Sequence, residues 1–279
     1  MNRYFVIGNP ISHSLSPQIH NYWFRKYSLT NSNYEKKKLE ENDLVKFVQE
    51  IRDEKNHING ANVTVPYKSK IIPFLDKLVP VAKETNSVNT IYKKDGKLIG
   101  DNTDEIAFRQ TIKELILSNK DTNVFLIGAG GVASSVLFAL RNLVGMYGKI
   151  YLSNRTKSKA IDLEKSDNGY LYVDKPKTEV LDWGEVPNAT LVINTTSVGL
   201  VKGENLQLDF TKYGKLKEKT LFYDLIYNPK ETNFIADAKR RGNKTMNGKQ
   251  MFLLQAKYAF QTWTGINAEI DDEIIKIAG

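Results

Sequence analysis

Polar residues that could bind and transform a small molecule occur in five short segments, each flanked by apolar or turn-forming residues. The segments are residues 14–16, 62–68, 87–90, 100–104 and 247–255. Each segment alone is more often a turn or a helix cap than a site. Together they offer hydroxyls, side-chain amides, an amine and a carboxylate. This set suits a polyhydroxylated, anionic substrate.

A glycine-rich turn at residues 128–133, GAGGVA, directly follows a short apolar strand and opens a helix. Gly128 permits the tight turn, Gly130 lets the backbone approach a pyrophosphate, and Ala133 allows close packing of helix on strand. The helix N-terminus adds free N–H groups and a positive dipole end. Because strand, turn and helix all fall where required, we expect dinucleotide binding rather than a turn without a ligand.

The end of the next strand indicates which dinucleotide binds. An NAD enzyme usually carries an acidic residue there for the ribose 2′-hydroxyl, whereas this chain has Asn154, Arg155 and Thr156, with Lys157 and Lys159 close behind. An arginine can pair with a 2′-phosphate that an acid would repel. The sequence therefore predicts NADP, the alternative being a helix cap followed by surface charge.

A second polar turn, at residues 194–199, lies at a later strand end, on the rim where a nicotinamide would lie. Thr195, Thr196 and Ser197 are its candidate cofactor contacts. The alternative is that this turn only ends the strand.

The hydrophobic pattern predicts the elements that hold these segments. In the first part of the chain we expect strands at 3–8, 33–39 and 58–66, a hairpin over 87–104, and helices at 17–27, 43–52, 67–75 and 105–118. Continuous apolar strands then follow at 123–128, 149–154, 191–196 and 220–227, with a last helix at 249–262.

This pattern predicts a two-domain α/β protein. The expected first domain, residues 1–104 with 247–279, is an α/β substrate-binding domain. The second, residues 105–246, is a Rossmann-type doubly wound parallel sheet that binds NADP. We expect the substrate to meet the cofactor in a crevice between the two domains.

Composition excludes several classes of protein. With no cysteine, the chain lacks disulfides, thiolate nucleophiles and cysteine-based metal sites, and its three histidines lack metal-ligand spacing, so no metal is expected. The net charge of +8 is spread over scattered lysines with acids between them, which does not indicate a nucleic-acid partner. No apolar run is long enough to span a membrane. We expect a cytoplasmic enzyme, monomeric or homodimeric, whose partner is a small-molecule substrate.

The motifs resemble those of the shikimate dehydrogenases. They occur in the family's order over nearly the whole chain, and several are highly specific: NPISHSLSP, NVTVPYK, SVNT, DNTD, GAGGVA, NRT, NTTSVG, DLIYNP and a closing NG…M…Q. The resemblance implies the reversible, NADPH-dependent reduction of 3-dehydroshikimate to shikimate.

The resemblance also implies a role for each matching residue. Lys68 and Asp104 would be the catalytic pair, with the relay of the proton between them left open. The substrate would be bound by Ser14, Ser16, Asn62, Thr64, Asn89, Tyr227 and Gln255. The cofactor would be bound by Gly128, Ala129, Gly130, Gly131, Val132, Ala133, Asn154, Arg155, Thr156, Lys159, Thr195, Thr196, Ser197 and Gly248.

Two departures leave the substrate open. Glu105 and Gln250 stand where the family usually has glycine, so the chain could be a paralogue that acts on a related substrate such as quinate. A quinate/shikimate dehydrogenase that uses NAD is a further rival, disfavoured because Asn154 stands where an acid would be expected. A non-catalytic NADP sensor is a rival from another class, disfavoured by the retained Lys68 and Asp104. A serine hydrolase built on Ser14 or Ser16 with His13 or His20 is disfavoured because neither serine lies in a G-x-S-x-G turn.

Overall fold

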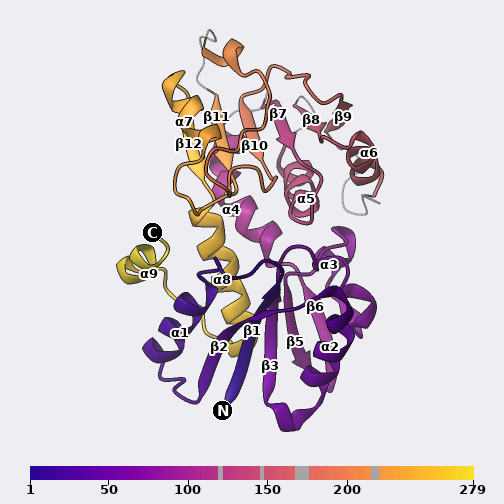
Figure 1. The fold of residues 1–279 in the computed structure, drawn as a ribbon, viewed down its shortest axis with the longest axis vertical. Coiled ribbons are helices and arrows are strands. Elements are labelled where there is room, and N and C mark those ends of the chain that lie inside the picture. Colours follow the sequence, from indigo (N-terminus) through magenta and orange to yellow (C-terminus); the bar gives the residue numbers. More distant parts are fainter. Residues whose placement is uncertain (119–121, 145–147, 167–175, 215–219) are drawn as a thin grey trace. The chain divides into compact units, whose positions relative to one another are not determined.

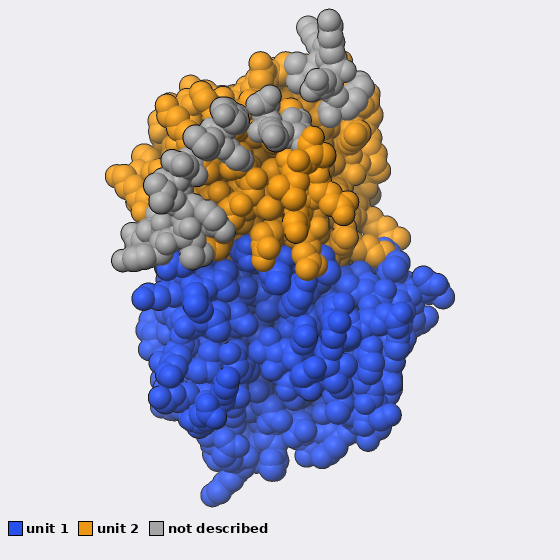
Figure 2. Space-filling model, turned by 180° about the vertical axis from the view of Figure 1, so that it is seen from behind, with its two compact units in different colours: residues 1–107, 253–279 blue, residues 108–252 orange. Residues whose placement is uncertain are grey.

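The computed structural model describes residues 1–118, 122–144, 148–166, 176–214 and 220–279. The chain divides into two compact units, one of Met1–Ala107 with Leu253–Gly279 and one of Phe108–Phe252 (Figures 1 and 2). Both divisions fall inside helices, α4 (Thr103–Leu117) and α8 (Lys249–Thr264). The limits expected from the sequence, 104/105 and 246/247, lie a few residues earlier in each case.

Unit 1 is built on a six-stranded mixed sheet with the order β2-β1-β3-β5-β6-β4. Its strands are β1 (Asn2–Gly8), β2 (Ser32–Lys38), β3 (Ile58–Val63), β4 (Lys77–Leu78), β5 (Thr90–Lys94) and β6 (Lys97–Asp101). β1 pairs in parallel with β2 and β3, whereas β5 is antiparallel to both β3 and β6. The first three strands of this order are thus parallel, and the remainder is the β5–β6 hairpin with the short β4 paired in parallel to β6.

The β5–β6 hairpin confirms a sequence prediction and shows its cause. Asp95 and Gly96 form the two-residue loop, with φ values of 51° and 70°. Positive φ at both loop residues gives the turn whose twist matches that of paired antiparallel strands, and Asp-Gly is among the few pairs that adopt it readily.

The described helices of unit 1 include three in its first part and one at its end. They are α1 (Ser16–Lys26), α2 (Leu44–Arg52), α3 (Pro80–Glu84) and α9 (Asp272–Ile277). Short 3₁₀ turns lie at Glu41–Asp43, Glu54–Asn56 and Ile72–Phe74. Buried side chains such as Phe5, Phe47 and Ile91 form a core under α2.

The predicted helix at residues 67–75 is wrong. Only the 3₁₀ turn Ile72–Phe74 forms there. Pro73 explains this, because it has no N–H to donate and its ring would clash with the carbonyl of Ser69 in a continuous helix. The preceding strand also ends earlier than residue 66, at Val63. The chain from Thr64 onward is therefore a loop, and Lys68 lies on it.

Unit 2 holds a six-stranded sheet that is parallel throughout, with the order β12-β11-β10-β7-β8-β9. The strands are β7 (Val124–Ile127), β8 (Lys149–Ser153), β9 (Lys177–Leu181), β10 (Leu191–Asn194), β11 (Leu221–Asp224) and β12 (Lys244–Asn247). Counted along the chain, this is the 3-2-1-4-5-6 order of nucleotide-binding sheets. The predicted α/β class and Rossmann-type sheet are confirmed.

Helices α5 (Ala133–Leu143), α6 (Lys157–Lys165) and α7 (Asn233–Arg240) connect the strands of this sheet, with a 3₁₀ turn at Thr211–Gly214. Strands β7, β10 and β11 and helix α7 supply a buried core, to which Phe125, Phe222 and Phe234 contribute. The strand order reverses between β7 and β10. In open α/β sheets, ligands bind beyond the carboxyl ends of the strands at such a reversal.

Candidate active site and cofactor site

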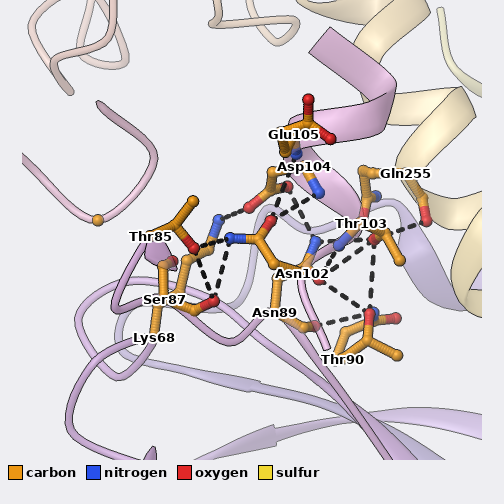
Figure 3. A network of polar contacts seen from close by, with 12 residues as sticks. Lys68, Thr85, Ser87, Asn89, Thr90, Asn102, Thr103, Asp104, Glu105 and Gln255 are labelled. Atoms are coloured by element: carbon orange, nitrogen blue, oxygen red, sulfur yellow. Dashed lines mark hydrogen bonds and ion pairs between the residues drawn. The ribbon is translucent and has the colours of Figure 1, made fainter. Parts of the chain in front are cut away.

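The polar residues of unit 1 gather at one edge of its sheet, where β3 and β6 end and β5 begins. Register brings them together, because Asn62 pairs with Thr90 and Thr90 pairs with Asp101. Helix α4 starts two residues later, and Lys68 reaches the same edge from the loop after β3. Figure 3 shows the resulting network of hydrogen bonds and ion pairs.

Lys68 and Asp104 form a buried ion pair at the centre of this network. The distance from Lys68 Nζ to Asp104 Oδ2 is 2.5 Å, and the side chains are only 11% and 7% exposed. Taking two charges out of water costs free energy unless their remaining hydrogen-bonding positions are satisfied. Within the part of the chain that the structure describes, Asp104 is the one partner of the Nζ, so two of its N–H groups remain for a ligand.

Asn89 holds the other carboxylate oxygen in place. Its Nδ2 donates to Asp104 Oδ1 and to Thr103 Oγ1, both at 2.9 Å. Its Oδ1 accepts the backbone N–H of Thr103 at 2.8 Å and the hydroxyl of Thr90 at 2.9 Å. Every hydrogen-bonding group of the Asn89 side-chain amide is therefore engaged, and this amide fixes the orientation of the Asp104 carboxylate.

Asn62 supports Asn89 in turn. Its Nδ2 donates to the Asn89 carbonyl at 3.0 Å and to Thr90 Oγ1 at 3.1 Å, while its Oδ1 accepts from the Tyr34 hydroxyl at 2.7 Å. Tyr34 was missed at the sequence level, because one tyrosine in a short strand carries no signal of what its hydroxyl will meet.

Asn102 caps helix α4 beneath Asp104. Its Oδ1 accepts the backbone N–H groups of Asp104 and Glu105 at 3.0 and 3.3 Å, and its Nδ2 donates to Thr85 Oγ1 and to the Ser87 carbonyl. Asparagine is among the preferred N-cap residues. That preference could have placed the start of the helix, and hence Asp104 in its first turn, from the sequence.

Other predicted substrate residues lie in unit 1 with separate surroundings. Ser14 and Ser16 are buried with their hydroxyl oxygens 3.2 Å apart, where α1 begins. The Gln255 carbonyl accepts from Thr103 Oγ1 at 3.1 Å, so this residue adjoins the network. Among the described residues, the hydrogen bonds of the network do not extend to the serine pair or to the half-buried Thr64.

In unit 2 the glycine turn has the geometry that a pyrophosphate requires. Gly128 has φ +112°, and a Cβ there would lie 2.5 Å from Thr195 Oγ1, so no other residue fits. A Cβ at Gly130 would meet nothing within 4 Å, which leaves an open cradle over the backbone. Ala133 is fully buried at the first turn of α5. The backbone at Gly130 is therefore open to a ligand, and the N-terminal end of α5 beside it offers N–H groups to an anion.

Of the candidate cofactor residues after β8, Asn154 supports the glycine turn and the others are exposed. Asn154 holds the glycine turn against the segment after β8. Its Oδ1 accepts the Ala129 N–H at 3.2 Å, and its Nδ2 donates to the Thr156 carbonyl at 2.8 Å. The side chains of Arg155, Thr156 and Lys159 are exposed. Cationic and hydroxyl groups, with no acid among them, therefore stand where the adenosine ribose would lie.

The remaining predicted cofactor and substrate residues of unit 2 lie after β10, β11 and β12. Thr195 Oγ1 donates to the Ile127 carbonyl at 2.8 Å, which links the 195–199 turn to the end of β7. Tyr227 stacks on Phe252 with ring centroids 4.1 Å apart. A Cβ at Gly248 would lie 1.9 Å from the Leu225 carbonyl oxygen, so this position must be glycine.

The two departures from the family pattern take different positions. The buried Glu105 side chain leaves α4 one residue after Asp104, about 100° around the helix, and points away from the Lys68–Asp104 pair (Figure 3). Gln250 is exposed on the first turn of α8. Glu105 therefore adds bulk and a carboxyl group near the pair without entering it.

No group of three or more histidine, cysteine, aspartate or glutamate side chains that could hold a metal ion occurs among the described residues. In those same ranges, no helix combines the length and apolar character needed to cross a bilayer.

Comparisons with known proteins agree across sequence and structure. Residues 6–91 match the family described as the shikimate dehydrogenase substrate binding domain. The shikimate dehydrogenase (NADP(+)) of Pelagibacter ubique is 45% identical over 274 residues, which cover 98% of this chain and 97% of that protein. The enzyme of the same name from Aquifex aeolicus is 38% identical over 94% of this chain and 91% of its own length.

Solved structures show the same relationship. The crystal structure of shikimate dehydrogenase from Aquifex aeolicus has a TM-score of 0.83 at 34% identity and covers all of this chain and 96% of its own. The shikimate 5-dehydrogenase of Thermus thermophilus, in complex with NADP(H) and shikimate, has a TM-score of 0.82 at 28% identity, with 100% and 98% covered.

Proposed function

Because the chain belongs to the shikimate dehydrogenase family, we propose that it catalyses the reversible, NADPH-dependent reduction of 3-dehydroshikimate to shikimate. The observation that carries this proposal is the buried Lys68–Asp104 pair, which is clamped by Asn89 and leaves part of the Lys68 ammonium open to a ligand. An ion pair that served only to stabilise the fold would have no need of an unsatisfied donor at this edge.

The reaction needs one hydride and one proton. The hydride to the ketone carbon would come from NADPH held by the residues after β7 and β8. As the carbonyl oxygen gains negative charge, the Lys68 ammonium donates one proton to it, so that an N–H bond breaks and the hydroxyl O–H bond forms. In the oxidising direction the neutral Lys68 amine takes that proton back.

Asp104 has a positioning task in this scheme. Its carboxylate keeps Lys68 Nζ in one place through the 2.5 Å contact and is itself held by Asn89 and by the N-cap of α4. Restricting the donor to one geometry lowers the barrier because little reorganisation is left for the transition state. We assign the proton transfer to Lys68 and the orientation to Asp104.

Substrate binding follows from the chemistry of the neighbouring groups. We propose that the Ser14 and Ser16 hydroxyls bind the substrate carboxylate, since they form a close pair at the start of α1. Thr64 and Gln255 would hold the ring hydroxyls, and Tyr227 is a further proposed substrate residue. Asn62 and Asn89 would act mainly by supporting Asp104, because protein partners engage their amides.

NADP rather than NAD is the proposed cofactor. The support is the exposed Arg155 with Thr156 and Lys159 after β8, where an acid would be needed to hold a ribose 2′-hydroxyl. Thr195, Thr196, Ser197 and Gly248 would lie at the nicotinamide end. A cytoplasmic location and a monomeric or homodimeric state remain predictions.

The test is an absorbance assay at the nicotinamide band, with shikimate and quinate each offered together with NADP or NAD. We expect turnover to be fastest with shikimate and NADP. Faster turnover with quinate, or with NAD, would replace this proposal by the quinate-acting or NAD-using alternative. NADP binding without turnover of either acid would indicate a sensor.

A further inference from the structure

Asp224, the last residue of β11, is a buried carboxylate that has only neutral partners. Its Oδ1 accepts from Asn194 Nδ2 and from the Ile226 backbone N–H, both at 3.1 Å, and its Oδ2 accepts from the Thr232 hydroxyl at 2.6 Å. Burial raises its pKa to about 6, and no cation among the described residues lies within ion-pair distance. Such a group costs folding free energy. Stability therefore does not explain it.

One side of Asp224 controls the turn at residues 195–199. Asn194 Oδ1 accepts from the Thr196 N–H at 3.0 Å and from its hydroxyl at 2.7 Å, while Asn194 Nδ2 also donates to the Val198 carbonyl at 3.2 Å. The carboxylate of Asp224 can only accept, so the NH₂ side of the Asn194 amide must face it. The oxygen side is then aimed at Thr196, and the shape of the turn follows.

The other side of Asp224 controls the segment before Tyr227. The Ile226 N–H is held by the carboxylate, and the Ile226 carbonyl accepts the Gly248 N–H at 3.1 Å. Leu225 lies so close to Gly248 that a Cβ there would meet its carbonyl oxygen at 1.9 Å. Residues 225–226 are thus fixed between Asp224 and Gly248, which determines where Tyr227 begins.

We propose that Asp224 is a positioning residue for the nicotinamide end of the cofactor site. It acts through Asn194 and Ile226 on three segments, the 195–199 turn, Tyr227 and Gly248, without touching the cofactor itself. The inference rests on the proposed function. In the described residues no hydrogen bond joins Asp224 to the glycine turn at 128–133 or to Arg155. The glycine turn lies against Thr195 of the 195–199 turn, whereas Arg155 and Thr156 lie after β8, so we expect the adenosine end of the site to be independent of Asp224.

This independence gives the test. Calorimetric titration of the full chain with NADP reports the whole site, whereas titration with adenosine 2′,5′-bisphosphate reports only the adenosine end. For Asp224→Ala we expect the Kd for NADP to rise by at least about tenfold, because Asn194 Nδ2 and the Ile226 N–H both lose the charged acceptor that holds them. The Kd for the bisphosphate should stay within about twofold of the wild-type value, since its contacts are untouched. Steady-state assays should show a higher KM for NADP together with a lower kcat.

Two results would overturn the proposal. Unchanged NADP affinity would show that the carboxylate positions nothing, and equal weakening of both ligands would show a general loss of structure in unit 2. A wild-type protein that binds neither ligand would instead contradict the proposed function.

Asp224→Asn is the conservative control. Its amide oxygen can accept from Asn194 and Ile226 while its NH₂ group donates to the Thr232 hydroxyl, so near wild-type NADP affinity is expected. An Asn variant as weak as the Ala variant would overturn the hydrogen-bond basis of the proposal. Asp209→Ala removes an exposed acid of the same unit and should change neither Kd.

Thr232 provides a milder variant should Asp224→Ala fail to fold. Thr232→Val removes one donor to the carboxylate, and we expect the Kd for NADP to rise by roughly threefold with the bisphosphate unaffected. Thr232→Ser keeps the hydroxyl and should restore the wild-type value. Identical NADP affinity in the Val and Ser variants would count against the proposal.

Discussion

The two units hold their buried carboxylates in opposite ways. In unit 1, Asp104 faces the Lys68 ammonium at 2.5 Å and retains its second oxygen for Asn89. In unit 2, Asp224 meets only neutral donors, and burial raises its pKa to about 6. We infer that unit 1 keeps a charged pair because a proton has to move there. Unit 2 uses its carboxylate only as an acceptor that arranges backbone segments.

The largest effect is expected from a substitution that breaks the charged pair of unit 1. Lys68→Ala should lower turnover by a factor of at least about 100, because the general acid is lost. The affinity for NADP, measured by fluorescence titration, should remain within about twofold since unit 2 is unaltered. The melting temperature should fall, because Asp104 is left buried without its counter-charge. Assays are therefore run well below it.

Lys70→Ala is the matched control for this variant. Lys70 lies two residues further along, is exposed and pairs with Glu41 at the surface, where ion pairs contribute little. It should retain full activity. Near-normal turnover of Lys68→Ala would remove the assignment of Lys68 as proton donor.

The next effect separates two glycines of unit 2 that share one turn. Gly130→Ala should leave the melting temperature unchanged, since its Cβ would meet nothing within 4 Å, yet raise the Kd for NADP because the methyl group occupies the cradle. A loss of about tenfold is expected, equivalent to about 1.4 kcal/mol of binding free energy. An unchanged Kd would show that no phosphate approaches this backbone.

Gly128→Ala should behave in the opposite sense and lower the melting temperature. At φ +112° a side chain is strained, and the added Cβ would lie 2.5 Å from Thr195 Oγ1. Together these cost at least about 2 kcal/mol of folding free energy. Differential scanning calorimetry of both variants makes the comparison, and equal stability of the two would contradict the geometry of the turn.

A smaller effect concerns the choice between NADP and NAD. Arg155→Ala should lower kcat/KM for NADP by about tenfold, the loss of one charge-assisted contact to a phosphate, and leave kcat/KM for NAD unchanged. Lys157→Ala is the control, because Lys157 is paired with Asp182 at 2.8 Å. Equal losses with both cofactors would show that Arg155 does not read the 2′-phosphate.

Sequence patterns predicted the elements whose apolar character is continuous. The strands β7, β8, β10 and β11 and the hairpin with Asp95-Gly96 were found because burial on both faces and positive φ leave clear signals. The edge strands β9 and β12 were missed, because KTEVL and KTMN are largely exposed or half-buried and carry no apolar run. Edge strands are paired on one side only, so hydrophobicity marks them poorly.

The same distinction applies to the residues of the site, of which some could be predicted from the sequence and others could not. Motifs pointed to Lys68, Asp104 and the glycine turn, whose chemistry depends on residue type. Tyr34 and Asp224 could not be found, since each acts through a partner distant in sequence, Asn62 and Asn194 respectively. A hydrogen bond between such residues depends on strand order and register, which local patterns do not contain.

The smallest expected effect compares buried titratable groups of the two units through the pH dependence of stability. His20 in unit 1 is fully buried, stacks on Tyr34 and has no hydrogen-bond partner for either ring nitrogen among the described residues. Burial lowers its pKa from 6.5 to about 3. Below pH 6.5 the histidine of the unfolded chain therefore binds a proton, whereas that of the folded chain stays neutral. The free energy of unfolding consequently falls as pH falls, by about 2 kcal/mol between pH 8 and pH 5.

Asp224 has the opposite sign. Its folded-state pKa of about 6 lies above the ordinary value of 3.8, so between these two values the folded chain binds more protons than the unfolded one. Its contribution to stability consequently grows as pH falls from about 6 towards 4, by about 1 kcal/mol at pH 5. The two buried groups thus respond to mild acid in opposite directions, with the histidine effect the larger.

Melting temperatures at pH 8 and pH 5 separate the two contributions. His20→Phe keeps an aromatic ring in the stack but cannot titrate, so its drop in melting temperature on acidification should be smaller than that of the wild type by roughly 5 °C. Asp224→Asn cannot titrate either, and its drop should be larger than that of the wild type. If both variants shifted the drop in the same direction, the opposite signs assigned to the two buried groups would be wrong, and with them the contrast between the two units.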